Sequence, residues 1–280
     1  LLSATITTTL AVSFTLLTVT AKLIVKFMTT AGVDCSGYSD IRKYDITGLT
    51  GGMVTYQGDQ RFNLRSPIFN TDCFIFANSR PLATATGIIN SEAYGFSFGP
   101  WKSSAHNKIE RNIKHSQANQ HCLMLVESPK LSQEVVDFPY IGFTHVIPVS
   151  KDVWDRYNEG SIQDNDFSED DIFTLDKNPD ESPYGIIIFS VGARPLSIQK
   201  KYHGDICDQH RPTLPLMAKA TAFHVRVVAE KFFKKDKEIP ILAQSANAYC
   251  YKFYTKYKLD SGKNSGDGCR IFTANVKLIT

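Results

Sequence analysis

Apolar and polar positions follow one another along the chain in patterns that predict a sheet with intervening helices. Short, mostly apolar runs are typical of buried strands, and they fall at 121–127, 141–149, 184–192, 239–243 and 269–276. The first two are joined by a loop and are predicted to pair antiparallel. The third, YGIIIFSVG, is the most apolar and is therefore predicted at the centre of the sheet.

Helical spacing predicts helices between these strands. Apolar residues recur at intervals of three and four along 216–233, and the polar stretch 101–119 carries its isoleucines on one side. Ser150 is suited to begin another helix as its N-cap, and Gly160 is suited to end it. From about residue 101 onward, the pattern therefore predicts strands with helices between most of them.

The last predicted helix follows the strand 239–243 directly. Ser245 is suited as its N-cap, and one helix face is apolar at three- and four-residue spacing. Asn247 and Tyr254 are seven residues apart, which is two turns on one side and about 10 Å along the axis. A polar side chain and a phenol are thus held at a fixed spacing along the helix, where both can contact an extended ligand. An ordinary amphipathic helix rich in tyrosine has the same spacing.

This helix resembles the last motif of the GNAT superfamily of N-acetyltransferases. The shared positions are Asn247, Cys250, Phe253, Tyr254 and Lys256. The chain departs from the motif at its end, where Lys258-Leu259 stands in place of Gly-Phe. A second block is similar to an insertion found in some bacterial members, in which an apolar-Pro-apolar strand end leads into a short helix and an acidic loop. Its residues are Ile147, Pro148, Val149, Ser150, Tyr157, Gly160, Ile162 and Asp164.

The resemblance implies an α+β (α/β) fold, with a GNAT-like mixed, mostly antiparallel central sheet flanked by helices and an N-terminal extension. It covers about 91–280, with a segment of unknown role at 29–90 and a candidate membrane anchor at 1–28 before it. The activity that it implies is transfer of an acetyl group from acetyl-CoA to an amine. The acceptor is then a small molecule or a peptide.

Site residues also follow from the resemblance. In the family, the pantetheine arm of acetyl-CoA pairs with backbone groups of the central strand, here Phe189, Ser190, Val191 and Gly192. Asn247 is carried over as a further cofactor residue. Tyr254 takes the role of the acid that protonates the leaving thiolate, since a phenol with a pKa near 10 keeps its proton at pH 7. A half-buried packing tyrosine is the alternative.

The segment expected to bind the pyrophosphate departs from the family pattern. Its candidate residues are Gln209, His210, Arg211 and Thr213. The family's glycines are absent, and Pro212 and Pro215 remove two backbone donors. Either an atypical loop binds the diphosphate through Arg211 and other side chains, or cofactor binding is lost. In the second case the chain is an inactive GNAT-like module that binds acyl-CoA or a partner.

The first 28 residues form a candidate membrane anchor. Residues 1–21 carry no charge, and Lys22 and Lys26 follow, which favours a cytoplasmic position for that end. Because the lysines follow the apolar run, a cleaved signal peptide is disfavoured. Threonine and β-branched residues are frequent here, so a strand fits as well as a helix. If the anchor dominates, the chain is a membrane-anchored interaction protein.

Composition and charge exclude several other classes. A net charge of +3 is too weak to indicate nucleic-acid binding, and the six cysteines and seven histidines show no metal-ligand or disulfide spacing. Reduced thiols favour a cytoplasmic location. Five of eight residues in 164–171 are acidic, which is typical of solvated surface, or of a lip that attracts a cationic amine. Asp180 and Glu181, just before the central strand, are the nearest candidates for a general base.

Overall fold

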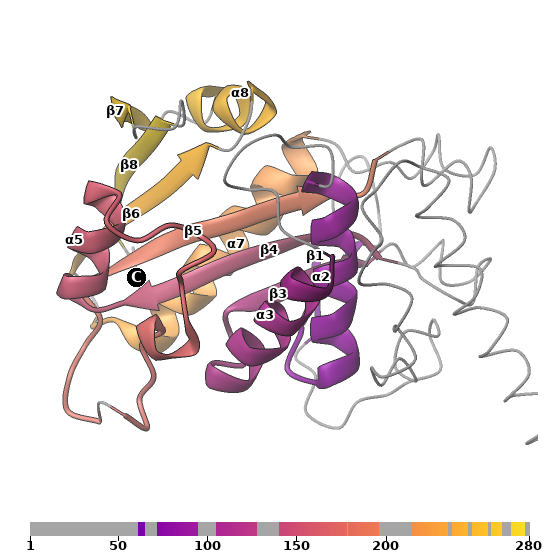
Figure 1. Ribbon diagram of the computed structural model, residues 1–280, viewed down its shortest axis with the longest axis horizontal. Coiled ribbons are helices and arrows are strands. Elements are labelled where there is room, and N and C mark those ends of the chain that lie inside the picture. Colours follow the sequence, from indigo (N-terminus) through magenta and orange to yellow (C-terminus); the bar gives the residue numbers. More distant parts are fainter. Residues whose placement is uncertain are drawn as a thin grey trace, which may run out of the picture.

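The computed structural model describes residues 61–64, 72–94, 105–127, 140–177, 179–195, 214–234, 237–245, 248–256, 259–264 and 270–277. Its strands are β1 (Arg61–Leu64), β2 (Asp72–Phe76), β3 (Leu123–Glu127), β4 (Tyr140–Val149), β5 (Gly185–Ala193), β6 (Glu238–Ser245), β7 (Asp260–Asn264) and β8 (Arg270–Lys277). Its helices are α2 (Arg80–Tyr94), α3 (Ala105–Ala118), α5 (Lys151–Glu159), the 3₁₀ helix η3 (Glu169–Asp171), α7 (Leu214–Phe232) and α8 (Ala248–Lys256). Figure 1 shows their arrangement.

The strands form one sheet in the order β1-β2-β3-β4-β5-β6-β8-β7. Neighbouring strands are antiparallel at every position except β5 and β6, which are parallel. The predicted fold class, a mixed and mostly antiparallel sheet flanked by helices, is therefore confirmed. The predicted antiparallel pairing of the first two apolar runs, now β3 and β4, is confirmed as well.

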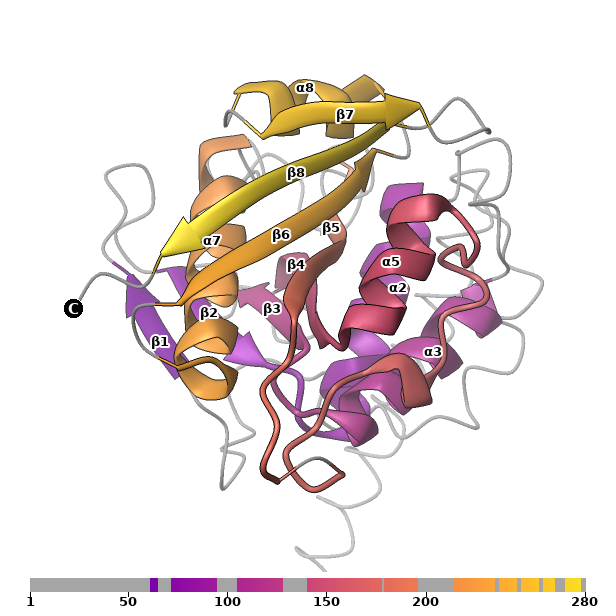
Figure 2. The same cartoon turned by 90° about the vertical axis from the view of Figure 1, so that its left-hand side faces the viewer.

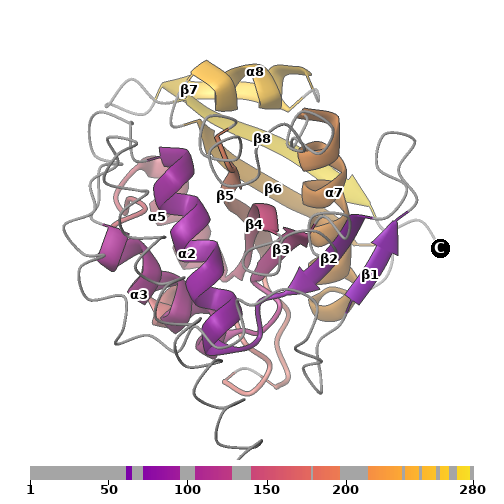
Figure 3. The same cartoon turned by 90° about the vertical axis from the view of Figure 1, so that its right-hand side faces the viewer.

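Each face of the sheet buries its own core. Figures 2 and 3 show α7 on one side of the central strands and α2, α3 and α5 on the other. Successive side chains of β5 point to opposite faces, so that Ile187 and Phe189 pack with α2, α3 and α5. Ile186 and Ile188 pack with α7 on the other face. A strand buried on both faces is apolar throughout, which is why 184–192 could be predicted as central.

Helix α2 was not predicted from the sequence. Twelve of its fifteen residues are buried, so no polar face gives it a helical period. Pro81 lies in the first turn, where the missing N–H costs nothing. Gly87 permits close packing, because a Cβ at this position would lie 2.6 Å from the Cα of Ile109 on α3. Proline and glycine therefore shape this helix instead of ending it.

Elements before residue 91 belong to the same sheet and core as those after it. Ser91, the predicted start of the domain, lies inside α2, and β2 pairs with β3. The candidate anchor at 1–28 lies outside the described residues and stays a prediction. Among the residues that are described, no helix is long and apolar enough to cross a membrane.

Two local predictions differ from the structure near the C-terminus. Ser245 is the last residue of β6, and its hydroxyl accepts a hydrogen bond from the backbone N–H of Arg270 (3.2 Å), so it does not act as an N-cap. The Gly-, Ser- and Asp-rich stretch 261–268 has a composition that predicts a turn, yet its first four residues belong to strand β7 (Asp260–Asn264). By contrast, Ser150 caps α5 as predicted, and Gly160 ends it in a left-handed conformation with φ of 77°.

β5 and β6 diverge, and this divergence positions the candidate site. The two strands pair only from Ile186 to Ile188 on β5, although β5 continues to Ala193. Phe189 is an extra residue in the β4–β5 ladder, because Ile188 lies opposite Val146 and Ser190 lies opposite His145. Such a bulge bends a strand. β5 therefore turns away from β6 at Phe189.

Candidate functional site

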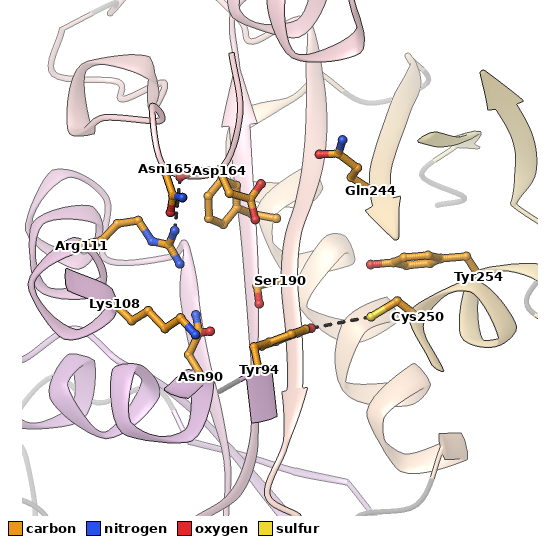
Figure 4. Close-up of a pocket in the computed structure, with 11 residues that line it drawn as sticks. Asn90, Tyr94, Lys108, Arg111, Asp164, Asn165, Ser190, Gln244, Cys250 and Tyr254 are labelled. Carbon is orange, nitrogen blue, oxygen red and sulfur yellow. Dashed lines mark hydrogen bonds between the residues drawn. The ribbon is translucent and has the colours of Figure 1, made fainter. Parts of the chain in front are cut away.

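A pocket lies where β5 and β6 separate. Its walls come from α2, α3, the segment between α5 and β5, the two diverging strands and α8 (Figure 4). The residues that line it are Asn90, Tyr94, Lys108, Arg111, Asp164, Asn165, Phe189, Ser190, Gln244, Cys250 and Tyr254. Side chains from both faces of the sheet meet here because the sheet is open at this point.

Two tyrosines and a cysteine form one side of the pocket. Tyr254 projects from α8 toward the cavity, with its ring packed on Phe272 (5.3 Å between centroids) (Figure 4). The hydroxyl of Tyr94 donates to the carbonyl oxygen of Val191 at 2.6 Å and lies 3.8 Å from Sγ of Cys250. Burial raises the pKa of both phenols well above 10. Both therefore remain protonated and can act as hydrogen-bond donors.

The opposite wall carries basic and amide groups. Lys108 and Arg111 extend from α3, and Asn90 extends from α2 (Figure 4). Nη1 of Arg111 donates to the backbone carbonyl of Asp164 at 3.2 Å, and the guanidinium lies over the ring of Phe189, 5.0 Å from its centroid. These two contacts hold the guanidinium in place at the edge of the pocket.

Asp164 supplies the carboxylate of the site. The hydroxyl of Tyr157 donates to its Oδ1 at 2.7 Å. Burial raises the pKa of Asp164 to about 6, although Arg111 and the hydrogen bond from Tyr157 favour the charged form and oppose the rise. A carboxylate that titrates near pH 6 is a stronger base than an ordinary aspartate and is still ionised at pH 7.

A pair of buried histidines lies behind Phe189. Nδ1 of His115 and Nε2 of His145 are 3.1 Å apart, and both rings contact the ring of Phe189. Burial lowers the pKa of His115 to about 3 and that of His145 well below 6.5. Nearby Arg111 contributes to both shifts. The pair is therefore neutral at pH 7 and belongs to the supporting core.

The structure brings together some of the predicted site residues. Phe189, Ser190 and Tyr254 line the pocket, and Val191 contacts Tyr94 through its carbonyl. Gly192 lies opposite Phe143, and a Cβ there would lie 2.2 Å from a ring carbon of that residue. The other predicted cofactor residues lie outside the described part of the chain: Gln209, His210, Arg211, Thr213 and Asn247.

The acidic segment 164–171 serves mainly local structure. Asp166 accepts from the backbone of Gln163, Asp171 caps η3 through Ser168, and Glu169 lies 3.7 Å from the ammonium of Lys114. Of its five carboxylates, only Asp164 lines the pocket. The acidic segment therefore contributes one carboxylate, that of Asp164, to the pocket.

Asp180 and Glu181, the candidates for a general base, lie away from the pocket. Both are exposed, and both precede the first residue of β5. The pocket lies past the middle of that strand, at Phe189 and Ser190, and neither carboxylate lines it.

Sequence reasoning also missed residues that the pocket needs. Asn90, Tyr94, Lys108 and Arg111 lie on two helices with no recognisable motif. Lys108 and Arg111 are three residues apart on α3, so they share a side of the helix, which is the one available signal. Within the described residues, no group of three or more histidine, cysteine, aspartate or glutamate side chains is arranged to hold a metal ion.

Comparisons with known proteins give one structural likeness. No protein-family model matches the chain, and no curated protein matches it by sequence. A crystal structure of mosquito arylalkylamine N-acetyltransferase like 5b is similar, with a TM-score of 0.43 and 10% sequence identity. The match covers 74% of this chain and 100% of the mosquito chain. A likeness at this level identifies no function.

Proposed function

We propose that this protein is a GNAT-like N-acetyltransferase that transfers an acetyl group from acetyl-CoA to the amine of a small molecule or peptide. The observation that carries the proposal is the opening between β5 and β6, faced by the protonated phenol of Tyr254. On the β6 side, backbone groups of β5 beyond Ile188 have no strand partner among the described residues. They are suited to bind an extended amide chain such as the pantetheine arm.

Other residues complete the proposed donor site. Phe189, Ser190, Val191 and Gly192 offer backbone groups along the opening. Gln209, His210, Arg211, Thr213 and Asn247 remain proposed contacts for the rest of acetyl-CoA, on the resemblance alone. Helix α7 begins directly after residues 209–213, and the backbone N–H groups at the N-terminus of a helix are suited to bind phosphate.

The proposed reaction is a direct transfer. Asp164 takes a proton from the acceptor ammonium, directly or through water, and the neutral amine attacks the thioester carbonyl. A C–N bond forms and the C–S bond breaks; Tyr254 gives its proton to the departing thiolate and regains one from the nitrogen, so that the products are the neutral amide and CoA. An ordinary thiol has a pKa near 8.5, below that of the phenol, so this transfer is coupled to the return of the nitrogen proton to Tyr254.

Tyr254→Phe is expected to lower the rate of acetyl transfer by about 10²-fold or more, because the ring stays and the proton is lost. Binding of acetyl-CoA, measured by calorimetry, should change little. Tyr251→Phe is the matched control, since Tyr251 lies on the same helix with 37% of its surface exposed and outside the pocket. Equal rates for Tyr254→Phe and the parent protein would remove Tyr254 from the mechanism.

Asp164 is expected to set the acid limb of the pH profile. If it is the base, kcat/KM should rise as pH increases through about 6, because the carboxylate must be ionised to accept a proton. Asp164→Asn should lose this limb and about 10²-fold or more in rate. Asp170→Asn, at an exposed residue paired with Lys177, is the control. An unchanged acid limb in Asp164→Asn would assign the base to another group.

A second candidate function is an inactive acyl-CoA- or partner-binding module. It is favoured by the hydrogen bond from Tyr94 to the Val191 carbonyl, one of the backbone acceptors expected to bind the pantetheine arm. Acetyl-CoA binding without turnover for any amine would support this alternative. Release of CoA that depends on an amine would exclude it.

A further inference from the structure

We infer that the acceptor carries a carboxylate close to its amine, as an amino acid does. This inference rests on the proposed function and names its substrate class. Its basis is the wall formed by Asn90, Lys108 and Arg111, which presents hydrogen-bond donors and positive charge to the pocket across from Tyr254 (Figure 4).

The donors on this wall are buried. Asn90 is 2% exposed and Lys108 is 3% exposed. Among the described residues, neither Nδ2 of Asn90 nor Nε of Arg111 has a hydrogen-bond partner. Buried donors are nearly always satisfied, and leaving one unsatisfied is costly. These two donors therefore have no acceptor among the described residues, and a ligand can supply one.

The chemistry of these donors selects a carboxylate. A guanidinium offers a planar set of N–H groups that matches the two oxygens of a carboxylate. The guanidinium of Arg111 is already oriented by the Asp164 carbonyl and the Phe189 ring, so little conformational freedom is lost on binding. Its Nη1 donates to the Asp164 carbonyl, whereas its Nε has no acceptor among the described residues. One edge of the group therefore remains for a ligand.

Charge balance leads to the same class of acceptor. The pocket holds two basic side chains, Lys108 and Arg111, and one carboxylate, Asp164. A simple ammonium would add a third positive charge to a buried site, which is unfavourable. An amino acid brings an ammonium for Asp164 and a carboxylate for the basic wall. Each charge of the acceptor then has an opposite charge in the pocket.

The test compares three forms of one acceptor at the same pH. Each of a panel of amino acids is assayed with acetyl-CoA beside its carboxamide and its decarboxylated amine, by release of CoA. We expect kcat/KM to be about 10- to 100-fold higher for the acid form, the ratio that corresponds to one charged hydrogen bond. This comparison uses the parent protein and is independent of the folding of any variant.

Arg111→Gln should remove this preference. Its kcat/KM for the amino acid should fall about 10- to 100-fold more than its kcat/KM for the carboxamide, which reports the effect of the change on Asp164 alone. Lys114→Gln is the matched control, because Lys114 is exposed on the same helix and does not line the pocket. It should keep the preference for the acid form.

The outcomes separate the inference from the function on which it rests. Transfer to carboxamides or decarboxylated amines at rates equal to or above those of the amino acids overturns the inference and leaves the acetyltransferase standing. A parent protein that binds no acetyl-CoA in calorimetry overturns both. Preference for the acid form that survives in Arg111→Gln, and is lost in Lys114→Gln, overturns the assignment of the wall.

Discussion

Glu92→Gln is expected to lower the free energy of unfolding by about 3–5 kcal/mol, because it removes one partner of a buried ion pair. The side chains of Glu92 and Arg194 are 1% and 2% exposed. Nε of Arg194 donates to Oε2 at 2.7 Å, and Nη2 donates to Oε1 at 3.2 Å. Arg194 directly follows β5, so this pair joins α2 to the end of the strand that opens the site. Without the carboxylate, the buried Arg194 cation loses both hydrogen bonds and the charge that Glu92 supplies.

Urea unfolding followed by circular dichroism measures this effect. Glu230→Gln is the matched control, since Glu230 pairs with Arg226 on the exposed side of α7, and its loss should cost less than about 1 kcal/mol. The double variant Glu92→Met with Arg194→Met should recover much of the stability, because neither charge of this pair is then buried. A loss below about 1 kcal/mol for Glu92→Gln would contradict the buried pair.

The sequence predicted those parts of the fold that have a strong period or a continuous apolar run. β4, β5 and α7 lie within a residue or two of the predicted bounds. A strand covered on both faces needs apolar residues throughout, and a helix that packs along one side needs them every three or four residues. Both requirements produce a pattern of apolar residues that can be recognised in the sequence without knowledge of the tertiary structure.

Helix α2 has no such pattern in the sequence, although it forms one wall of the pocket. It is packed against α3 and the sheet and carries buried polar residues as well as apolar ones. Hydroxyls of Thr84 and Ser91 bond to carbonyls one turn earlier, which satisfies them inside the helix. Polar residues that are satisfied locally look like loop residues in the sequence.

The basic wall of the pocket could not be predicted for a different reason. Lys108 and Arg111 lie in a polar stretch that is typical of a solvated helix, and Asp164 lies in an acidic run that is typical of surface. They meet because α3 and the segment after α5 cover the same face of the sheet, which local pattern does not encode. Tyr254, which lines the same pocket, could be predicted as a candidate because the motif that the sequence resembles lies within one helix.

Acidification from pH 7.5 to 5.5 is expected to lower the free energy of unfolding by a net of about 3 kcal/mol, because three buried histidines outweigh the opposite effect of Asp164. Burial lowers the pKa of His115 to about 3 and of His224 to about 4, and that of His145 well below 6.5. These side chains stay neutral in the folded protein, whereas they take up protons near pH 6.5 in the unfolded chain. Stability is therefore complete above pH 6.5 and is lost as pH falls toward the folded-state values.

The size of this effect follows from linkage. Each histidine favours the unfolded chain by roughly 1.4 kcal/mol at pH 5.5, or about 4 kcal/mol together. The contribution of Asp164 has the opposite sign, because its pKa is raised to about 6 in the folded protein. Its protonation between pH 7.5 and 5.5 stabilises the folded protein by roughly 1 kcal/mol. For these four groups the sum is a net loss of about 3 kcal/mol, and His121, whose pKa is also lowered by burial, acts in the same direction.

Urea titrations at pH 7.5, 6.5 and 5.5 measure this loss, and His224 offers the sharpest variant. Its Nδ1 accepts from the hydroxyl of Thr144 at 2.7 Å and its Nε2 donates to the carbonyl of His121 at 2.7 Å. His224→Gln should be less stable at pH 7.5 but should lose about 1.4 kcal/mol less on acidification, since glutamine does not titrate. Equal stability of the parent protein at pH 7.5 and 5.5 would mean that the histidines are not held neutral in the core.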